Sequence, residues 1–309
     1  MKAAKKSIGD ALRARKDTVA LVDVEIMAYQ VCLEALQEHR QPDGTWTWTL
    51  DEGAAVLNLK ARITDAATMA GCGEVVLAVG SANNWRRRLC PSYKSNRDGK
   101  KKPLGYRAVM EQVEEEFKTV KQDWLEADDV LGILATGAYN YKSVIVSSDK
   151  DMATVPCRLF NPSQPEEGVT TYTEEQADVE HAVRALAGDV ADGYKGCKGV
   201  GETKARAALL ARKSGESTWS VALKLFEKAG HDAEYAIEQF RLARVLRSGE
   251  YDPFKKSVNL WQPPPGSVVV VALPPAGRGA AAGDGAAPAG ANRRVARVAV
   301  RARKAVRGR

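Results

Sequence analysis

The stretch KSVIVSSDKD at residues 142–151 decides the fold. Its apolar run at 144–146 is β-branched, as expected of a buried strand, and Asp149 and Asp151 follow two positions apart. Residues i and i+2 of an extended chain point the same way, so both carboxylates leave the strand end toward one spot. Ligands of parallel α/β sheets bind beyond these strand ends, so the pattern predicts half of a metal site. Taken alone, such a D-x-D sequence is more often only a solvated turn.

Other acidic groups stand at similar points. The apolar run VALV at 19–22 predicts a first buried strand that ends at Asp23, with Glu25 two positions later. The run EADD at 126–129 places three carboxylates directly before a helix-forming segment. Capping and the helix dipole explain one acid at a helix N-terminus, but not three. Like charges about 4 Å apart repel by roughly 4 kcal/mol near a protein surface, so this cluster requires cations or wide spacing.

The remaining patterns predict an α/β body that is followed by helices. Further predicted elements are a helix from the first strand to about Glu38, a turn at 41–44, a helix at 51–69, a strand at 74–79, a helical segment at 104–121, a loop at 160–175, and helices at 174–186, 202–212, 216–229 and 232–247. Residues 45–50 are compatible with an edge strand or a packed loop. Residues 251–261 are expected to pack back on the body.

Residues 85–107 are strongly basic, with nine Lys or Arg against the single acid Asp98 and with three aromatic residues interleaved. Basic side chains neutralise phosphates and aromatic rings stack on bases, which is the combination that single-strand binding surfaces use. The alternative is a solvated, mobile loop.

The segment GDVADGYKGCKGVGETKA at 188–205 combines two acids with a glycine-rich turn. Asp189 and Asp192 share one face if the segment is helical. The turn at 196–201 leads into a helix, whose N-terminal N–H groups can hold a phosphate. A G-V-G sequence alone is usually only a connection.

The charge is concentrated at the C-terminus. Of the 46 basic and 39 acidic residues, nine basic residues but one acid lie from Pro263 onward, so the net charge of +7 comes from the tail. Residues 263–309 are rich in Pro, Gly, Ala, Val and Arg, which predicts a disordered, basic tail that could hold nucleic acid weakly. Residues 1–18 form a basic arm without the apolar region of a secretory signal.

Cysteine usage and hydropathy restrict the class of protein. The five cysteines are widely spaced and odd in number, which matches neither a zinc motif nor a disulfide framework. We therefore expect a reducing cytoplasm. No apolar run reaches the length of a membrane span, so no membrane partner is expected.

Four blocks in this order resemble the bacteriophage 5′-to-3′ exonucleases of the flap-endonuclease-like (5′-nuclease) superfamily. The blocks are NWRRR…YKSNRDGKKKPLGY at 84–106, EADDVLGILA at 126–135, SSDKDMATVP at 147–156 and the segment at 188–205. The LVD sequence at 21–23 matches the family's first-strand carboxylate, and QFRLARVLRSGEY…NLW at 239–261 resembles the end of the phage enzymes. The resemblance covers about residues 18–262.

The resemblance implies a mixed α/β fold with a largely parallel central sheet flanked by helices. It implies a nuclease domain at 19–180 with a helical arch at about 85–120. It also implies a helical DNA-binding subdomain at 181–262, in which residues 188–210 form a helix–three-turn–helix. The implied activity is divalent-metal-dependent hydrolysis of DNA from 5′ ends, and the implied partner is a duplex with a 5′ end, a flap or a single-stranded 5′ end.

The resemblance also assigns residues. The implied ligands of two Mg²⁺ or Mn²⁺ ions are Asp23, Glu126, Asp128, Asp129, Asp149, Asp151, Asp189 and Asp192. The implied contacts to the scissile phosphate are Arg86, Lys94 and Arg97. The implied DNA-binding residues are Arg87, Tyr93, Lys100, Lys101, Lys102, Gly199, Gly201 and Lys204. In relatives the turn that contains the two glycines also holds K⁺.

One position departs from the family pattern. Aligning on Asn84 places Ser81 where the family has another Asp, and a neutral hydroxyl is a weaker ligand. Two alternatives therefore stay open. One is a flap endonuclease or ribonuclease with the same metal site, and the other is a DNA-binding relative with weakened catalysis.

Overall fold

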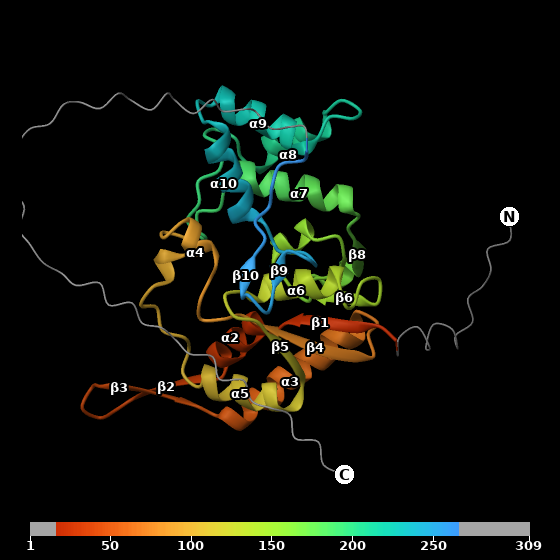
Figure 1. Cartoon of the computed structure of the whole chain (residues 1–309). Coiled ribbons are helices and arrows are strands. Elements are labelled where there is room, and N and C mark those ends of the chain that lie inside the picture. Colours follow the sequence, from red (N-terminus) through yellow and green to blue (C-terminus); the bar gives the residue numbers. More distant parts are fainter. Residues whose placement is uncertain (1–16, 266–309) are drawn as a thin grey trace, which may run out of the picture. The chain divides into compact units, whose positions relative to one another are not determined.

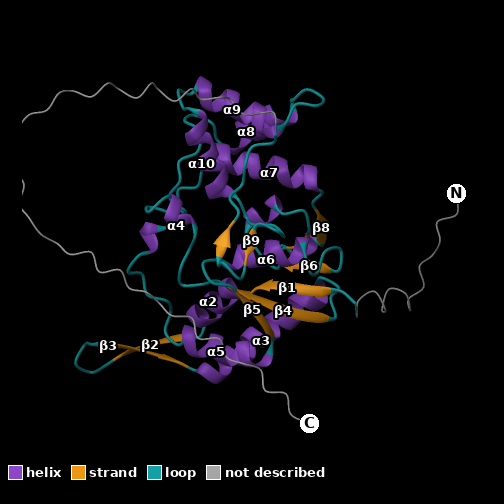
Figure 2. Ribbon diagram, viewed as in Figure 1, coloured by secondary structure: helices purple, strands orange, loops and turns teal. Residues whose placement is uncertain are grey.

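A central six-stranded sheet carries the fold of residues 17–265, which are the residues that the computed structural model describes. Its order is β5-β4-β1-β6-β7-β8, and all neighbours are parallel except β7 and β8 (Figures 1 and 2). The strands are β1 Val19–Asp23, β4 Glu74–Val79, β5 Lys118–Lys121, β6 Ser143–Val146, β7 Arg158–Phe160 and β8 Val169–Thr171. The predicted strands at 19–23, 74–79 and 144–146 and the mostly parallel α/β class are confirmed.

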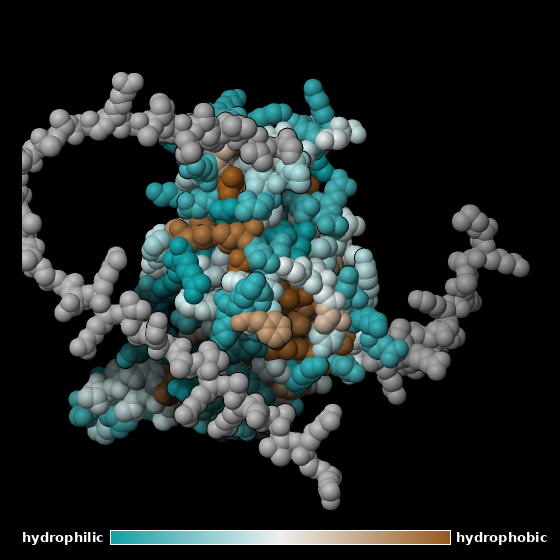
Figure 3. Space-filling view, in the orientation of Figure 1, coloured by the Kyte–Doolittle hydropathy of each residue, from teal (hydrophilic) through white to brown (hydrophobic). Residues whose placement is uncertain are grey.

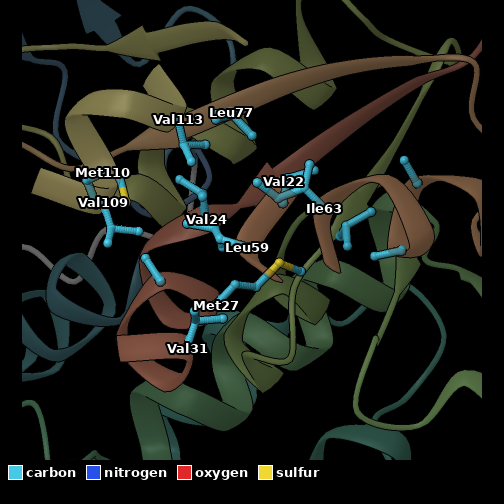
Figure 4. Packing of buried hydrophobic residues seen from close by; sticks show 14 of the residues in the cluster. Val22, Val24, Met27, Val31, Leu59, Ile63, Leu77, Val109, Met110 and Val113 are labelled. Carbon is cyan, nitrogen blue, oxygen red and sulfur yellow. The ribbon is translucent and has the colours of Figure 1, made fainter. Parts of the chain in front are cut away.

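Successive side chains of the buried strands pack alternately into two separate hydrophobic cores, one on each face of the sheet. In β1, Ala20 and Val22 belong to one apolar cluster, and Val19 and Leu21 belong to another on the opposite face. A strand buried on both faces reads as a continuous apolar run, which explains the VALV sequence. The first cluster is covered by α2 Val24–Glu34, α3 Glu52–Met69 and α5 Tyr106–Glu116 (Figure 4). The second is covered by α6 Ala127–Thr136 and by residues 245–246.

The C-terminal helices form a third cluster. They are α7 Glu174–Ala187, α8 Glu202–Leu210, α9 Thr218–Lys228 and α10 Ala233–Ala243. Trp219, Phe226 and Phe240 lie at its centre, and Trp261 stacks on Phe240 at 4.7 Å between ring centroids. The expected return of residues 251–261 to the body is confirmed, with a small hairpin of β9 Tyr251–Asp252 and β10 Ser257–Val258 on the way.

Three element predictions were wrong. The helix after β1 ends at Glu34 instead of Glu38, because residues 36–40 pair with residues 46–50 as the hairpin β2 Leu36–Arg40 and β3 Trp46–Leu50. Residues 118–121, expected to be helical, form the edge strand β5. Within the expected loop at 160–175, residues 169–171 form β8 and pair with β7.

The predicted arch and the predicted DNA-binding subdomain also differ from the structure. Only short helices, α4 Arg86–Leu89 and the 3₁₀ turn Ser95–Arg97, lie between residues 85 and 105. Helix α5 is instead part of the sheet's core. Residues 188–201 form turns, so the helix–turn–helix is α7 with α8 and does not lie within 188–210. The boundary expected at 180 falls inside α7.

Most of the predicted arm at 1–18 and of the tail at 263–309 lies outside the described residues. Among residues 17–265, no helix combines the length and the apolar composition that a membrane crossing requires.

Candidate active site

A cleft of about 370 Å³ lies beyond the carboxyl ends of β1 and β6. Parallel strands end at one edge of a sheet, which brings acids from distant parts of the sequence together there. Of the eight predicted ligands, all of them within the described residues, seven line this cleft with Lys94 and Arg97: Asp23, Glu126, Asp128, Asp149, Asp151, Asp189 and Asp192. The sequence therefore predicted the convergence correctly, except at Asp129.

Local structure positions five of the seven acids at the start of a helix or a 3₁₀ turn, whereas Asp189 and Asp192 lie in a turn. Asp23 ends β1 and directly precedes α2, and Glu126 caps α6. Asp149 caps the 3₁₀ turn Lys150–Thr154 by accepting a hydrogen bond from the Asp151 N–H at 2.8 Å. Helix N-termini favour negative charge, so the backbone stabilises this crowding in part.

Four of the acids, Asp23, Asp128, Asp149 and Asp189, have no Lys or Arg within ion-pair distance among the described residues. Burial raises the pKa of Asp23 to about 6, with the charges of Glu25 and Asp149 adding to the rise and a hydrogen bond from Ser147 opposing it. Burial, followed by the charges of Asp149 and Asp23, raises the pKa of Asp128 well above its usual range. Asp23, Asp128 and Asp149 repel one another, and the charge of Lys94 offsets this repulsion only in part at Asp128.

Glu126 and Asp192, by contrast, are compensated. Glu126 accepts hydrogen bonds from Arg86 and Lys94, and Asp192 lies 3.1 Å from the Arg97 guanidinium and 3.4 Å from Lys94 Nζ. Burial alone would raise the pKa of Glu126, but Arg86 and Lys94 outweigh it and lower the pKa to about 2. The cleft therefore has an uncompensated acidic part and an ion-paired part.

Asp151 belongs to the paired part and connects the cleft to the helices. Its carboxylate lies 2.9 Å from Arg184 Nε, and the same guanidinium contacts Glu202, the first residue of α8. Lys150 donates to Glu202 at 2.9 Å. Burial and the charge of Asp149 nevertheless raise the pKa of Asp151 to about 6, against the effect of Arg184. Arg184 was not predictable from the sequence, because its partners Asp151 and Glu202 are distant along the chain.

The predictions for Asp129 and Arg86 were wrong. Asp129 is fully buried and does not line the cleft; its oxygens accept two hydrogen bonds of 2.8 Å from Arg86, one from Trp85 Nε1 and one from the Leu246 N–H. The Arg86 guanidinium is buried as well, so it has no access to a phosphate in the cleft. Neither side chain of this pair lines the cleft.

Tyr93 was expected to stack on DNA, and this prediction was also wrong. The ring is buried, and its hydroxyl donates to Glu126 at 3.1 Å and to Asp192 at 2.9 Å. Tyr93 instead fixes the two compensated carboxylates.

Lys94 is held at the cleft by a strained backbone. Its φ of 52° is a left-handed conformation that costs about 1–2 kcal/mol for a residue with a side chain. The Lys94 N–H donates to the Asp192 carbonyl at 2.8 Å, which holds this conformation. The ammonium group thereby stays beside Glu126 and the acidic part of the cleft.

Asp189 and Asp192 do not share a helix face, because their segment is a turn. Asp189 accepts hydrogen bonds from the N–H groups of Ala191 and Asp192 at 2.7 and 3.0 Å, which closes the turn. The backbones of Gly188 and Gly196 pass so closely that a Cβ on either would lie under 3 Å from the other strand of the turn. Both aspartates line the cleft despite the missing helix.

The remaining DNA-binding candidates lie on the surface. Lys100, Lys101 and Lys102 are exposed, and Lys102 lies over the Tyr106 ring at 4.5 Å. Arg87 is half-exposed and is paired with Asp98. On the helical side, Gly199 and Gly201 are exposed immediately before α8, with a φ of 74° at Gly199, and the Lys204 ammonium donates to the Gly199 carbonyl at 3.0 Å.

Ser81 does not line the cleft, whereas Glu25 does. The Ser81 hydroxyl accepts a hydrogen bond from the Asn83 N–H at 3.3 Å. A Glu25 carboxylate oxygen lies 3.2 Å from the position of a Cβ on Gly80, at the end of β4. The absence of a side chain there leaves room for Glu25. The sequence showed this acid two positions after Asp23, but nothing in it assigned Glu25 a role.

The residues fit a hard divalent cation by the chemistry of their donors. The acids of the cleft supply carboxylate oxygens only, which Mg²⁺ and Mn²⁺ prefer, and no His or Cys lines the cleft among residues 17–265. In that range, no three His, Cys, Asp or Glu side chains are arranged around one point as a finished ion site.

Comparison with known proteins agrees with this chemistry. The family described as "5'-3' exonuclease, N-terminal resolvase-like domain" matches residues 18–181. An exonuclease of Escherichia phage T7 is 33% identical over 230 residues, which cover 61% of this chain and 74% of that protein. An exodeoxyribonuclease of Enterobacteria phage T3 is 32% identical over 228 residues, covering 61% and 73%. A solved phage T5 5′-exonuclease gives a TM-score of 0.49 at 13% identity, covering 74% of this chain and 88% of that one.

Proposed function

Because this chain belongs to the 5′-3′ exonuclease family, we propose that it hydrolyses the phosphodiester bonds of DNA from 5′ ends with divalent metal ions held in the cleft. The observation that carries the proposal is the meeting of Asp23, Asp128 and Asp149 without a basic partner among the described residues. Repulsion between such groups is relieved most effectively by a cation.

Asp23, Asp128 and Asp149 would hold one Mg²⁺ or Mn²⁺, and Asp151, Asp189 and Asp192 lie where they could hold a second. Bound divalent ions lower the pKa of a coordinated water and neutralise charge on attacking and leaving oxygens. Asp151 and Asp192 are the ligands that exchange a basic partner for the ion, since Arg184 and Arg97 contact them here.

Lys94 and Arg97 complete the site from its basic side. Both line the cleft, and their charges oppose the accumulation of negative charge on a phosphate. The strained backbone at Lys94 fixes the ammonium group before substrate arrives, so less side-chain ordering is required on binding.

The turn before α8 is the proposed contact to duplex DNA. Its exposed Gly199 and Gly201 allow a phosphate backbone to approach the N-terminus of α8, and Lys204 adds a charge there. A K⁺ ion between this turn and the DNA is part of the proposal. Arg184 and Glu202 connect α7 and α8 to Asp151, so a duplex bound at the turn is adjacent to the cleft.

A nuclease assay with end-labelled duplexes tests the proposal. The duplex carries the label at either the 5′ or the 3′ end and is incubated with Mg²⁺, with Mn²⁺ or with EDTA. We expect early release of 5′-labelled mononucleotides or short products with either metal, and none with EDTA. Release from the 3′-labelled end first, or cleavage in EDTA, contradicts the proposal. Flap and RNA–DNA hybrid substrates in the same assay distinguish exonuclease from structure-specific or ribonuclease activity.

A further inference from the structure

The β2–β3 hairpin exposes two tryptophans that neither the core nor the cleft uses. Trp46 and Trp48 are each 51% exposed, and the hairpin projects from the body beside α5 (Figures 1 and 3). A two-stranded hairpin is at best marginally stable by itself. Two large exposed side chains that lie together are a candidate binding surface.

Both tryptophans lie on the same face of the hairpin. They are two positions apart on β3, and Leu50 lies two positions further on the same face. Leu50 packs against the main core, and its side chain closely approaches Gly105. The face that carries Trp46 and Trp48 is therefore the face that meets the basic segment at its base. Trp48 is held in place by a hydrogen bond of 3.1 Å from its Nε1 to Glu38.

The basic segment runs from the cleft to this hairpin. Arg97 lines the cleft, three exposed lysines follow at residues 100–102, and Gly105 contacts the hairpin at Leu50. The nine residues 97–105, with one arginine and three lysines against Asp98, thus join the catalytic cleft to the base of the hairpin. Charges for phosphates beside flat rings for bases are what a single strand requires, whereas a duplex hides its base faces.

We propose that the hairpin face with Trp46 and Trp48, together with Lys100–Lys102, binds a single-stranded DNA segment next to the cleft. The indoles stack on unpaired bases and the lysines contact the phosphates between these bases and the scissile bond. The inference deepens the proposed function and rests on it in one respect, because it takes the nucleic acid to be the strand whose end enters the cleft.

The test measures the binding of a labelled oligo(dT) of about 16 nucleotides by fluorescence anisotropy in EDTA, where no cleavage occurs. Trp46→Ala with Trp48→Ala is expected to raise Kd by about tenfold or more, since each stacked base contributes substantially. The double Phe variant should retain most of the affinity. Quenching of tryptophan fluorescence by oligo(dT) should disappear in the double Ala variant.

Two further variants separate stacking from charge and from hairpin folding. Thr47→Ala with Thr49→Ala alters the opposite face of the same hairpin, where the two hydroxyls contact His39, and should leave Kd unchanged. Replacing Lys100–Lys102 by Ala should lower the slope of log K against log salt by about 2.

The outcomes are distinct. Unchanged oligo(dT) affinity in the double Ala variant overturns the inference and favours a protein as the partner that contacts the indoles. An equal loss with a blunt duplex overturns the preference for single strands, and an equal loss in the threonine variant shows that hairpin folding is measured instead. If the wild type fails to cleave DNA but the tryptophan variant still loses oligo(dT) binding, the proposed function fails and this inference stands.

Discussion

Replacing Arg86 by Met should destabilise the fold far more than an exposed phosphate-binding arginine would. The Arg86 guanidinium is 3% exposed and makes two hydrogen bonds of 2.8 Å to Asp129. It also donates to Glu126 at 2.9 Å and to the carbonyls of Leu242 and Arg244 at 3.1 and 2.5 Å. The side chain thus joins α4, α6 and the end of α10.

The expected loss of stability follows from the Asp129 carboxylate, which stays buried without its partner. Breaking one partner of a buried ion pair costs about 3–5 kcal/mol, because the other charge stays buried without compensation. In a domain of this size, 1 kcal/mol shifts Tm by roughly 2–4 °C, so Arg86→Met should lower Tm by about 6–20 °C. Adding Asp129→Asn removes the unpaired charge and keeps one oxygen, which can accept from either Trp85 Nε1 or the Leu246 N–H, so the double variant should recover part of this loss.

Thermal and urea unfolding in EDTA measure both variants against the wild type. Arg97→Met is the matched control, since Arg97 lines the cleft, is 55% exposed at its side chain, and should change Tm by less than about 3 °C. A loss below about 1 kcal/mol for Arg86→Met, accompanied by a fall in cleavage rate, would refute a structural role for Arg86. Such a result would indicate that Arg86 contacts the scissile phosphate.

Three other predictions concern the acids of the cleft. The pKa values of Asp23 and Asp151 are raised to about 6, against about 3.9 in an unfolded chain. Between about pH 4 and 6 the metal-free folded state therefore binds more protons than the unfolded state does. The free energy of unfolding of the metal-free protein should therefore fall as pH rises from about 4 to 6. Mg²⁺ should raise Tm more at pH 7.5 than at pH 5. Calorimetry that finds the same Mg²⁺-induced rise in Tm at both pH values would contradict this. Glu25→Gln should weaken Mn²⁺ binding, measured by titration calorimetry, by roughly tenfold with little change in Tm, and an unaltered affinity would exclude Glu25 from the site. Because Ser81 does not line the cleft, Ser81→Asp should leave cleavage at low Mg²⁺ unchanged, whereas a clear rise would show that a carboxylate at this position reaches the metal.

The sequence predicted the cleft well because its acids mark the ends of apolar strands. Asp23 and Asp149 follow continuous apolar runs, and parallel topology then brings them to one edge of the sheet. Which of several adjacent acids points into the cleft was not predictable. Asp128 and Asp129 are neighbours on α6, but a helix turns by about 100° per residue, so one lines the cleft and the other meets Arg86.

Long-range partners and local ambiguity explain the remaining errors. Tyr93 lies in a basic segment, which favours the prediction that its ring stacks on bases. The ring is buried instead, and its hydroxyl contacts two carboxylates that lie 33 and 99 residues away in the sequence. The hairpin at 36–50 was missed because the helix pattern of α2 continued past Glu34, whereas the turn with a φ of 84° at Gly44 allowed both flanks to pair.

The central claim is that uncompensated carboxylates in the cleft hold the metal that cleaves DNA. Its most direct test is to measure cleavage and DNA binding together for Asp149→Asn, which keeps the size of the side chain and the N-cap oxygen. We expect cleavage in Mg²⁺ to fall by at least about 100-fold while the Kd for duplex DNA changes by less than about threefold. Cleavage at the wild-type rate, or an equal loss of both properties, would contradict it.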